Sequence, residues 1–278
     1  MYGDSKAGLR QETGGVIAAT APRAVSRSVA VCLLGGFRLL KLGEPVEVRP
    51  GGKTQALLSA LAMRHPTGVA REELIGLIWP SSDSSMGGQS LNTLVSSLNR
   101  SLGDALGGRP SVVHSGGRYR LNEEDGVGVD ITWFDHAIAE GERCGRSGDE
   151  PGALRSYRAA IELYVGDLAL AAVVDHVVER ERLRARYLSA RARLADAMFA
   201  AADYGGALDN ALDLLAHDPC REDAHRMAMR SYVRLGQRAQ ALRQYTVCCS
   251  VLAREFDAPP EPLTQALFDL VRLRPDQV

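Results

Sequence analysis

The sequence lacks most features that mark a metalloprotein, a secreted domain or a membrane protein. Its five cysteines, Cys32, Cys144, Cys220, Cys248 and Cys249, have neither C-x-x-C spacing nor histidine partners at zinc-ligand spacing, which argues against a metal site and against structural disulfides. No segment approaches 18 consecutive apolar residues, and Val16 to Ala21 is too short and too small in side chain for a membrane span or a signal-peptide core. We expect a soluble cytoplasmic protein with buried thiols and no metal.

Catalytic signatures are also missing. The chain has no Ser-His-Asp order, no paired-acid signature and no cofactor fingerprint, so we expect neither an enzyme nor a bound cofactor. One segment, Gly51-Gly52-Lys53-Thr54, is similar to the end of a phosphate-binding loop. That motif requires glycine where this chain has Glu47, whose carboxylate would repel phosphates. A nucleotide hydrolase is therefore the disfavoured alternative. It would be revived if the protein bound a nucleotide and Lys53→Ala abolished that binding.

Acidic residues are scarce in one part of the chain. Residues 21 to 121 hold 12 Arg or Lys against 6 Asp or Glu, a net charge of +6, whereas the whole chain carries −1 and the remainder therefore −7. Affinity for duplex DNA that does not depend on sequence comes from neutralising phosphates. This division is typical of one part that binds nucleic acid and another that binds protein.

The segment from Gln89 to Arg100 predicts an amphipathic helix whose outer face has no carboxylate. An apolar stripe of Leu91, Leu94, Val95, Leu98 and Leu102 must face a core. The opposite face carries Gln89, Thr93, Ser96 and Arg100, with Asn92 and Ser97 at its edges. Donors and acceptors without negative charge are what a helix in the major groove requires, although many solvated helices are also polar.

A basic hairpin follows this helix. Two short strand-like runs within Ser111 to Leu121 are joined by Ser115-Gly116-Gly117, a hairpin signal. Its residues His114, Arg118 and Tyr119 are candidates for a wing that contacts DNA; the alternative is a solvated surface hairpin.

The residues before the helix predict the rest of a small α+β domain. Strands are expected at 30–34, 37–40 and 46–48, and helices at 53–63 and 71–79, the second ended by Pro80. Strands, three helices and a final hairpin make a winged helix. Lys53 is a candidate phosphate contact or a solvated lysine, and Trp79 either braces the DNA backbone or fills the core.

Three regions are predicted: a disordered leader at 1–28, a winged-helix DNA-binding domain at 29–124 and an all-α domain at 125–278. The last is rich in Ala, Leu and Arg, with recurrent turn signals. Ala207-Leu208 and Ala241-Leu242 are 34 residues apart, the tetratricopeptide period, and Ala153-Leu154 precedes the first of them by 54. Stacked helix pairs of this kind either hold a partner or only support packing and dimerisation.

This combination resembles the small members of the Streptomyces antibiotic regulatory protein (SARP) family. These couple an OmpR-type winged helix to a bacterial transcriptional activator domain of tetratricopeptide-like helices. The resemblance covers residues 29 to 273 and rests on 33–37, 73–75, 77–80, Leu91, 96–103, 117–121, 129–134, 159–168, 221–229 and 235–242. Many relatives carry arginines where this chain has Gly88 and Ser97, which leaves its target sequence open.

The resemblance implies an activator of a biosynthetic gene cluster, for an antibiotic or another secondary metabolite, acting on the nucleoid. Such proteins bind direct repeats near the promoter −35 element as a homodimer or side-by-side pair, and contact the sigma and alpha subunits of RNA polymerase. Gln89, Thr93, Ser96 and Arg100 would then read bases, and the wing would hold phosphates. The alternative is a repressor, or a sensor whose helical domain takes a peptide or small ligand.

Overall fold

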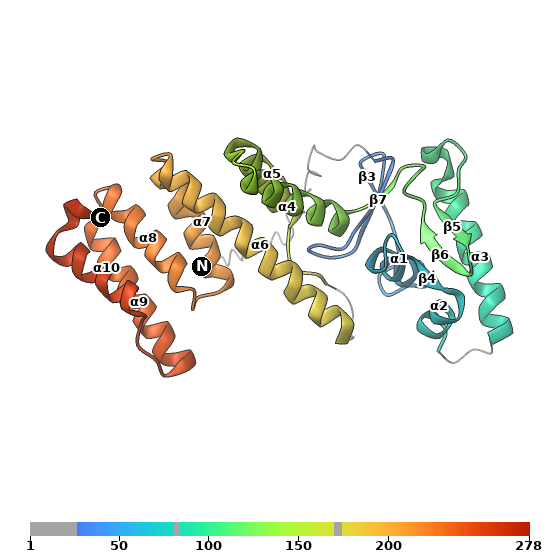
Figure 1. Ribbon diagram of the computed structural model, residues 1–278. Helices are drawn as coiled ribbons and strands as arrows, with labels where there is room; N and C mark the ends of the chain where they lie inside the picture. Colours follow the sequence, from blue (N-terminus) through green and yellow to red (C-terminus); the bar gives the residue numbers. More distant parts are fainter. Residues whose placement is uncertain (1–26, 81–83, 170–173) are drawn as a thin grey trace, which may run out of the picture.

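The computed structural model describes residues 27–80, 84–169 and 174–278. The chain is elongated, with the β-containing part at one end and the last helices, α8 to α10, at the other (Figure 1). The predicted leader at 1–28 lies outside the described residues except for its last two positions.

A four-stranded sheet of order β3-β2-β1-β7 begins the fold. Strands β1 (Val29–Cys32), β2 (Arg38–Lys41) and β3 (Glu44–Val46) form an antiparallel meander, as expected from the apolar runs and the glycines between them. Strand β7 (Val127–Val129) pairs with β1 in parallel, and the sequence did not predict it because three residues carry too little pattern. All four residues of β1 are buried, since it lies between two neighbours.

Three helices follow, α1 (Lys53–Met63), α2 (Arg71–Ile78) and α3 (Ser84–Leu102), and α3 runs into the 3₁₀ turn η1 (Gly103–Leu106). The predicted apolar stripe of α3 faces the core: Leu91, Leu98 and Leu102 are buried, and Leu94 and Val95 are partly buried against it. Glycines set the approach of α3 to α2, because a Cβ added at Gly87 would lie 2.6 Å from Ile75 Cγ2.

The hairpin predicted after α3 is present as β5 (Val112–Ser115) and β6 (Arg118–Leu121), and β4 (Val69–Ala70) completes a small sheet of order β4-β6-β5. The glycines of its turn, Gly116 and Gly117, have φ of 59° and 75°, a conformation that few residues with a Cβ adopt. Asn99 of α3 secures the hairpin: its Oδ1 accepts from Val112 N at 2.9 Å, and its Nδ2 donates to Val112 O at 3.1 Å.

The rest of the described chain is helical, as the sequence predicts. It comprises α4 (Asp130–Arg146), α5 (Glu150–Leu163), α6 (Val174–Ala200), α7 (Tyr204–His217), α8 (Glu222–Arg234), α9 (Arg238–Phe256), α10 (Pro262–Leu273) and the 3₁₀ turn η2 (Pro275–Gln277). Figure 1 shows successive helices packed side by side.

Small residues allow these helices to approach closely. Ala207 and Ala241, the pair separated by the tetratricopeptide period, are both fully buried. A second repeat lies in the caps: Asp149 accepts from Gly152 N at 3.0 Å at the start of α5, and Asp203 accepts from Gly206 N at 2.9 Å at the start of α7. An α+β winged-helix domain followed by tetratricopeptide-like helices is therefore the fold, which confirms the predicted class.

A buried carboxylate joins the two parts. Asp130, the first residue of α4, is 2% exposed and accepts hydrogen bonds of 2.9 to 3.0 Å from the backbone N–H groups of Leu33 and Leu34. Burial raises the pKa of this carboxyl to about 6, against the opposing effect of the backbone donors. Nearby, Gly35 N donates to Asp167 O at 3.1 Å, and the core continues from β1 through α4 to α6. The predicted boundary at 124/125 falls just before β7, which belongs to the N-terminal sheet.

Candidate nucleic-acid interface

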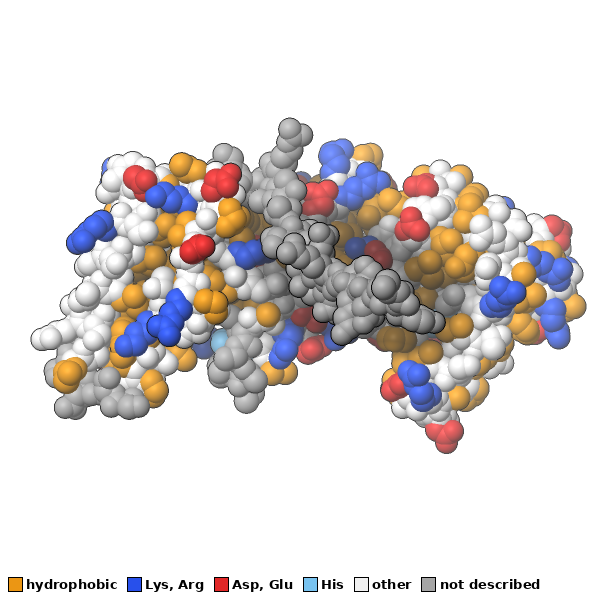
Figure 2. Space-filling view, turned by 180° about the vertical axis from the view of Figure 1, so that it is seen from behind, with side chains coloured by type: hydrophobic (Ala, Val, Ile, Leu, Met, Phe, Trp, Pro, Cys, Tyr) orange, Lys and Arg blue, Asp and Glu red, His pale blue; other side chains and the backbone are white. Residues whose placement is uncertain are grey.

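The outer face of α3 is an uncharged polar surface with one arginine. All six side chains predicted to lie there are exposed, namely Gln89, Asn92, Thr93, Ser96, Ser97 and Arg100. No Asp or Glu occurs in α3. The end of the molecule that α3 occupies is largely white in Figure 2, the colour of uncharged polar side chains and backbone. Such a surface can approach a major groove without repelling phosphates.

The wing lies beside this face and is held by its own arginine. The Arg118 guanidinium donates to Gly68 O at 2.9 Å and to Thr67 O at 3.2 Å, the two residues before β4. His114 is exposed, and the centroid of its ring lies 4.4 Å from the centroid of the Tyr119 ring. His114 and Arg118 therefore lie on the wing as predicted, with part of the Arg118 donor capacity used to hold the hairpin.

Tyr119 is placed differently from the prediction of a direct DNA contact. Its side chain is 4% exposed because it packs under the hairpin in the core. Its hydroxyl accepts from Arg71 Nη1 at 2.7 Å and donates to Asn92 Oδ1 at 3.2 Å. The buried ring supports the interface from below, which corrects the role given to Tyr119.

Arg71, which the sequence did not single out, connects α2, α3 and the wing. Besides Tyr119, its guanidinium donates to Asn92 Oδ1 at 2.9 Å and to Gly88 O at 2.9 Å. A Cβ at Gly88 would lie 2.7 Å from Arg71 Nη2, so glycine leaves room for this guanidinium. We call Arg71, Gly88, Asn92 and Tyr119 the Arg71 cluster. Its partners lie 17 to 48 residues away in sequence, so no local pattern marks it.

Trp79 and Lys53 form a pair at the start of α1. Trp79 is 8% exposed and belongs to the core. Of its two predicted roles, bracing the DNA backbone or filling the core, the structure supports the second. Lys53 is exposed, with its Nζ 5.1 Å from the centre of the Trp79 ring. Trp79 is thus too buried to touch a DNA backbone directly, and Lys53 carries the positive charge at this point.

The glycines before Lys53 do not form a phosphate-binding loop. They follow β3, a three-residue edge strand antiparallel to β2, whereas the motif follows a strand of a βα unit and wraps the phosphates in its backbone. Gly51 N is already bound to Gln55 Oε1 at 2.7 Å. This geometry gives no support to the nucleotide hydrolase.

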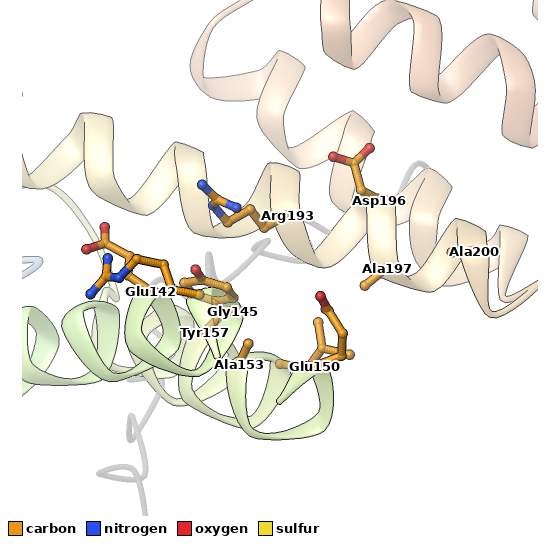
Figure 3. Close-up of a pocket in the computed structure, with 11 residues that line it drawn as sticks. Glu142, Gly145, Glu150, Ala153, Tyr157, Arg193, Asp196, Ala197 and Ala200 are labelled. Atoms are coloured by element: carbon orange, nitrogen blue, oxygen red, sulfur yellow. The ribbon is translucent and has the colours of Figure 1, made fainter. Parts of the chain in front are cut away.

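The helical part holds a cleft of about 670 Å³ between the α4–α5 pair and α6 (Figure 3). Its apolar lining includes Ala153, Leu154 and Ala197, and Arg193 of α6 lies over the Tyr157 ring at 6.0 Å. Charges of both signs border it, from Glu142, Arg146, Glu150, Arg193 and Asp196. Burial raises the pKa values of Tyr157 and Asp196, which favours their protonated forms. The cleft is a candidate site for a partner or ligand.

Two further searches cover the described residues. Among them, no group of three or more His, Cys, Asp or Glu side chains is arranged to hold a metal ion. Within the same ranges, no helix is long and apolar enough to cross a membrane.

Comparison with known proteins identifies the helical part. A family model described as "Bacterial transcriptional activator domain" matches residues 129–272, just over half of the chain. The chain belongs to this family. The match begins within β7 and ends within α10, so it coincides with the helical domain.

Relatives extend the similarity to the winged helix. Regulatory protein AfsR of Streptomyces griseus is 27% identical over 230 residues, which are 82% of this chain but 22% of AfsR. Transcriptional regulatory protein MoaR1 of Mycobacterium bovis is 27% identical over 265 residues, 91% of this chain and 81% of MoaR1. The chain thus spans less than a quarter of AfsR and about four fifths of MoaR1.

A solved structure shares the fold across both parts. The structure described as Mycobacterium tuberculosis EmbR in complex with low affinity phosphopeptide has a TM-score of 0.66 and 22% identity, covering 88% of this chain and 65% of that one. The SARP-type arrangement predicted from the sequence, a winged helix followed by the activator domain, is confirmed, and the chain is a transcriptional regulator of this type.

Proposed function

We propose that this regulator is an activator that binds promoter DNA through α3 and the wing and recruits RNA polymerase. The observation that carries the proposal is the exposed, carboxylate-free face of α3 beside the wing. In this arrangement Gln89, Thr93 and Ser96 read bases. Arg100, near the end of the helix, contacts a guanine or a phosphate. Lys53, His114 and Arg118 hold the backbone.

Charge supports a division of labour. The basic part from 21 to 121 meets the phosphates, and the remainder, net −7, meets protein. We propose the sigma and alpha subunits of polymerase as the protein partners. Two copies side by side on direct repeats near the −35 element require a repeat spacing of a whole helical turn, about 10 to 11 base pairs or a multiple. The regulated genes would form a biosynthetic cluster, and the protein would act in the cytoplasm on the nucleoid.

Transcription in vitro tests this proposal. The full chain is added to polymerase holoenzyme and a template carrying the promoter adjacent to its gene, and DNA binding and transcript are measured in parallel. We expect both binding and an increase in transcript. Binding without an increase would reject the activator role, and no binding would reject the proposed DNA interface.

The cleft favours one alternative, a repressor or sensor that responds to a ligand. About 670 Å³ is enough for a peptide segment or small molecule, and its border carries both charge signs. Under this alternative, Arg193→Glu would change the response of transcription to an added ligand or peptide and leave DNA binding intact. An unchanged response would leave the cleft without a role in regulation.

A further inference from the structure

We propose that Arg71 and Tyr119 fix the side-chain amide of Asn92 so that it offers only hydrogen-bond donors to DNA, which selects guanine at the base that Asn92 faces. This inference rests on the proposed function and adds a specificity rule to it. Arg71 and Tyr119 act as positioning residues, and Asn92 makes the contact.

The chemistry of the partners fixes the orientation of the amide. A guanidinium has donors and no acceptor, so the Asn92 atom 2.9 Å from Arg71 Nη1 must be the oxygen. The Tyr119 hydroxyl accepts from the same Nη1 at 2.7 Å, which turns its own proton toward Asn92 Oδ1 at 3.2 Å. Reversing the amide would put its N–H group against the Arg71 guanidinium, which has no acceptor. The buried position of Tyr119 and the bond from Arg71 to Gly88 O hold both partners in place.

The outward atom of Asn92 is therefore its nitrogen. Asn92 is exposed at the edge of the polar face of α3, and no side chain or backbone group within the described ranges accepts a hydrogen bond from its Nδ2. An unconstrained asparagine can rotate its amide to donate to adenine N7 and accept from adenine N6 at once. Here the oxygen is occupied twice, so the accepting half of that pair is lost.

Base chemistry then ranks the four possibilities. Guanine presents two acceptors, N7 and O6, in the major groove; adenine presents one acceptor beside a donor, thymine one acceptor, and cytosine a donor. A group with donors alone favours guanine and disfavours cytosine. The Arg71 cluster converts the usual adenine reader into a guanine reader without adding a charge to the helix.

Substitutions can separate this rule from a general loss of affinity. The binding site of the full-length protein is first found by selection from random duplex DNA, and then each position is changed to all four base pairs. Affinities are measured by fluorescence anisotropy at one salt concentration. For Asn92→Asp, the inward oxygen is kept while the outward group becomes an acceptor. We expect a guanine preference of about tenfold at one position to be lost and cytosine to become preferred.

Two more variants release the amide instead of changing it. In Arg71→Met, Asn92 regains the freedom to rotate, because the remaining Tyr119 hydroxyl can accept as well as donate, so adenine should rise to match guanine at the same position. Tyr119→Phe keeps the bond from Arg71 to Asn92 Oδ1 and should shift the preference less. Ser101→Asp is the matched control, because it places the same charge at an exposed position of the same helix, outside the cluster and outside the six side chains of the DNA-binding face. It should weaken binding to all four sequences alike.

Base preference is a readout that a purely structural role would not change. If the unaltered protein binds a specific sequence and Asn92→Asp shows the same base ranking at every position, the inference is wrong, while the proposed function stands. If the unaltered protein shows no sequence preference, the proposed function fails and the inference fails with it.

Discussion

Helices α3 and α6 both carry arginines, but they use them in different ways. On α6, Arg182 binds Asp135 at 2.7 Å and Glu179 at 2.6 Å, Arg186 binds Asp135 at 2.6 Å, and Arg191 binds Asp213 at 2.6 Å. On α3, Arg100 is exposed on a helix without a carboxylate. A paired arginine holds helices together, whereas an arginine without a carboxylate nearby can meet a phosphate or a base.

The comparison shows where composition misleads. Arginine is abundant in both parts of the chain, yet on α6 its charge is neutralised by carboxylates from α4 and α7. A count of basic residues would assign DNA binding to the helical domain as readily as to the winged helix. What distinguishes the two surfaces is pairing: among the described residues, Arg182, Arg186 and Arg191 form ion pairs, and Arg100 forms none.

The largest effect is expected on the paired side, for Asp135→Ala. Removing this carboxylate leaves Arg182 and Arg186 partly buried with fewer partners, which should lower the free energy of unfolding by about 2 kcal/mol. Chemical denaturation measures the change, and DNA affinity of the folded protein should not change. Glu140→Ala, which breaks an exposed pair with Arg143, is the control and should change the free energy of unfolding far less, because solvent screens that pair. Equal effects would mean that the α4–α6 pairs are not structural.

On the unpaired side, Arg100→Ala should weaken specific DNA binding by about 1.5 kcal/mol, roughly tenfold, and leave stability unchanged. Exposed Arg243 of α9 provides the matched control, because Arg243→Ala removes the same charge from the helical domain. If both variants lost the same affinity, only the loss of a positive charge would matter, and the position of Arg100 on α3 would not.

A smaller effect is expected where α3 packs on α2. In Gly87→Ala the new methyl meets Ile75 at 2.6 Å, and strain of about 2 kcal/mol is offset in part by better helix propensity, leaving a loss of about 1 kcal/mol. The displaced α3 should also bind DNA more weakly. Gly76→Ala has no atom within 4 Å of the new Cβ and should stabilise α2 instead. Stabilisation in both variants would show that α3 can move without consequence.

The last effect depends on pH and concerns the joint between the two parts. Burial raises the Asp130 pKa to about 6 from an ordinary value of 3.8. Between these pH values the folded state therefore keeps a proton on this carboxyl that the unfolded state releases. Its contribution to stability is present below pH 3.8 and is lost as the pH rises toward 6. The stability advantage of the unaltered protein over Asp130→Asn should therefore shrink between pH 4 and 6, to about 1 kcal/mol at pH 7, where Asn leaves one backbone N–H unpaired.

A carboxylate of opposite behaviour serves as the control for Asp130. The hydrogen bond from Lys41 lowers the pKa of the exposed Asp104 carboxyl, so the stability it contributes is lost as the pH falls. The advantage of the unaltered protein over Asp104→Asn should thus grow with pH. Parallel pH profiles for the two variants would contradict the assigned role of Asp130.

Periodicity predicted much of this structure, and contacts distant in sequence account for what it missed. The stripe of α3 and the wing turn follow from local spacing, so Leu91 and Gly116 lie where the pattern requires. Strands β4 and β7 are two and three residues long, too short for a pattern. Arg71 and Asp130 owe their roles to partners 17 to 97 residues away. Tyr119 was predicted to contact DNA as part of the wing, but its side chain is buried between the exposed Arg118 and Arg120.

The most direct test of the DNA interface is a hydroxyl-radical footprint of the full chain on the DNA upstream of the operon next to its gene. The account predicts protected stretches that recur at about 10 to 11 base pairs or a multiple. It also predicts that Arg100→Ala loses this protection at a protein concentration where Arg243→Ala keeps it. No protection, or protection that survives in Arg100→Ala and disappears in Arg243→Ala, would contradict it.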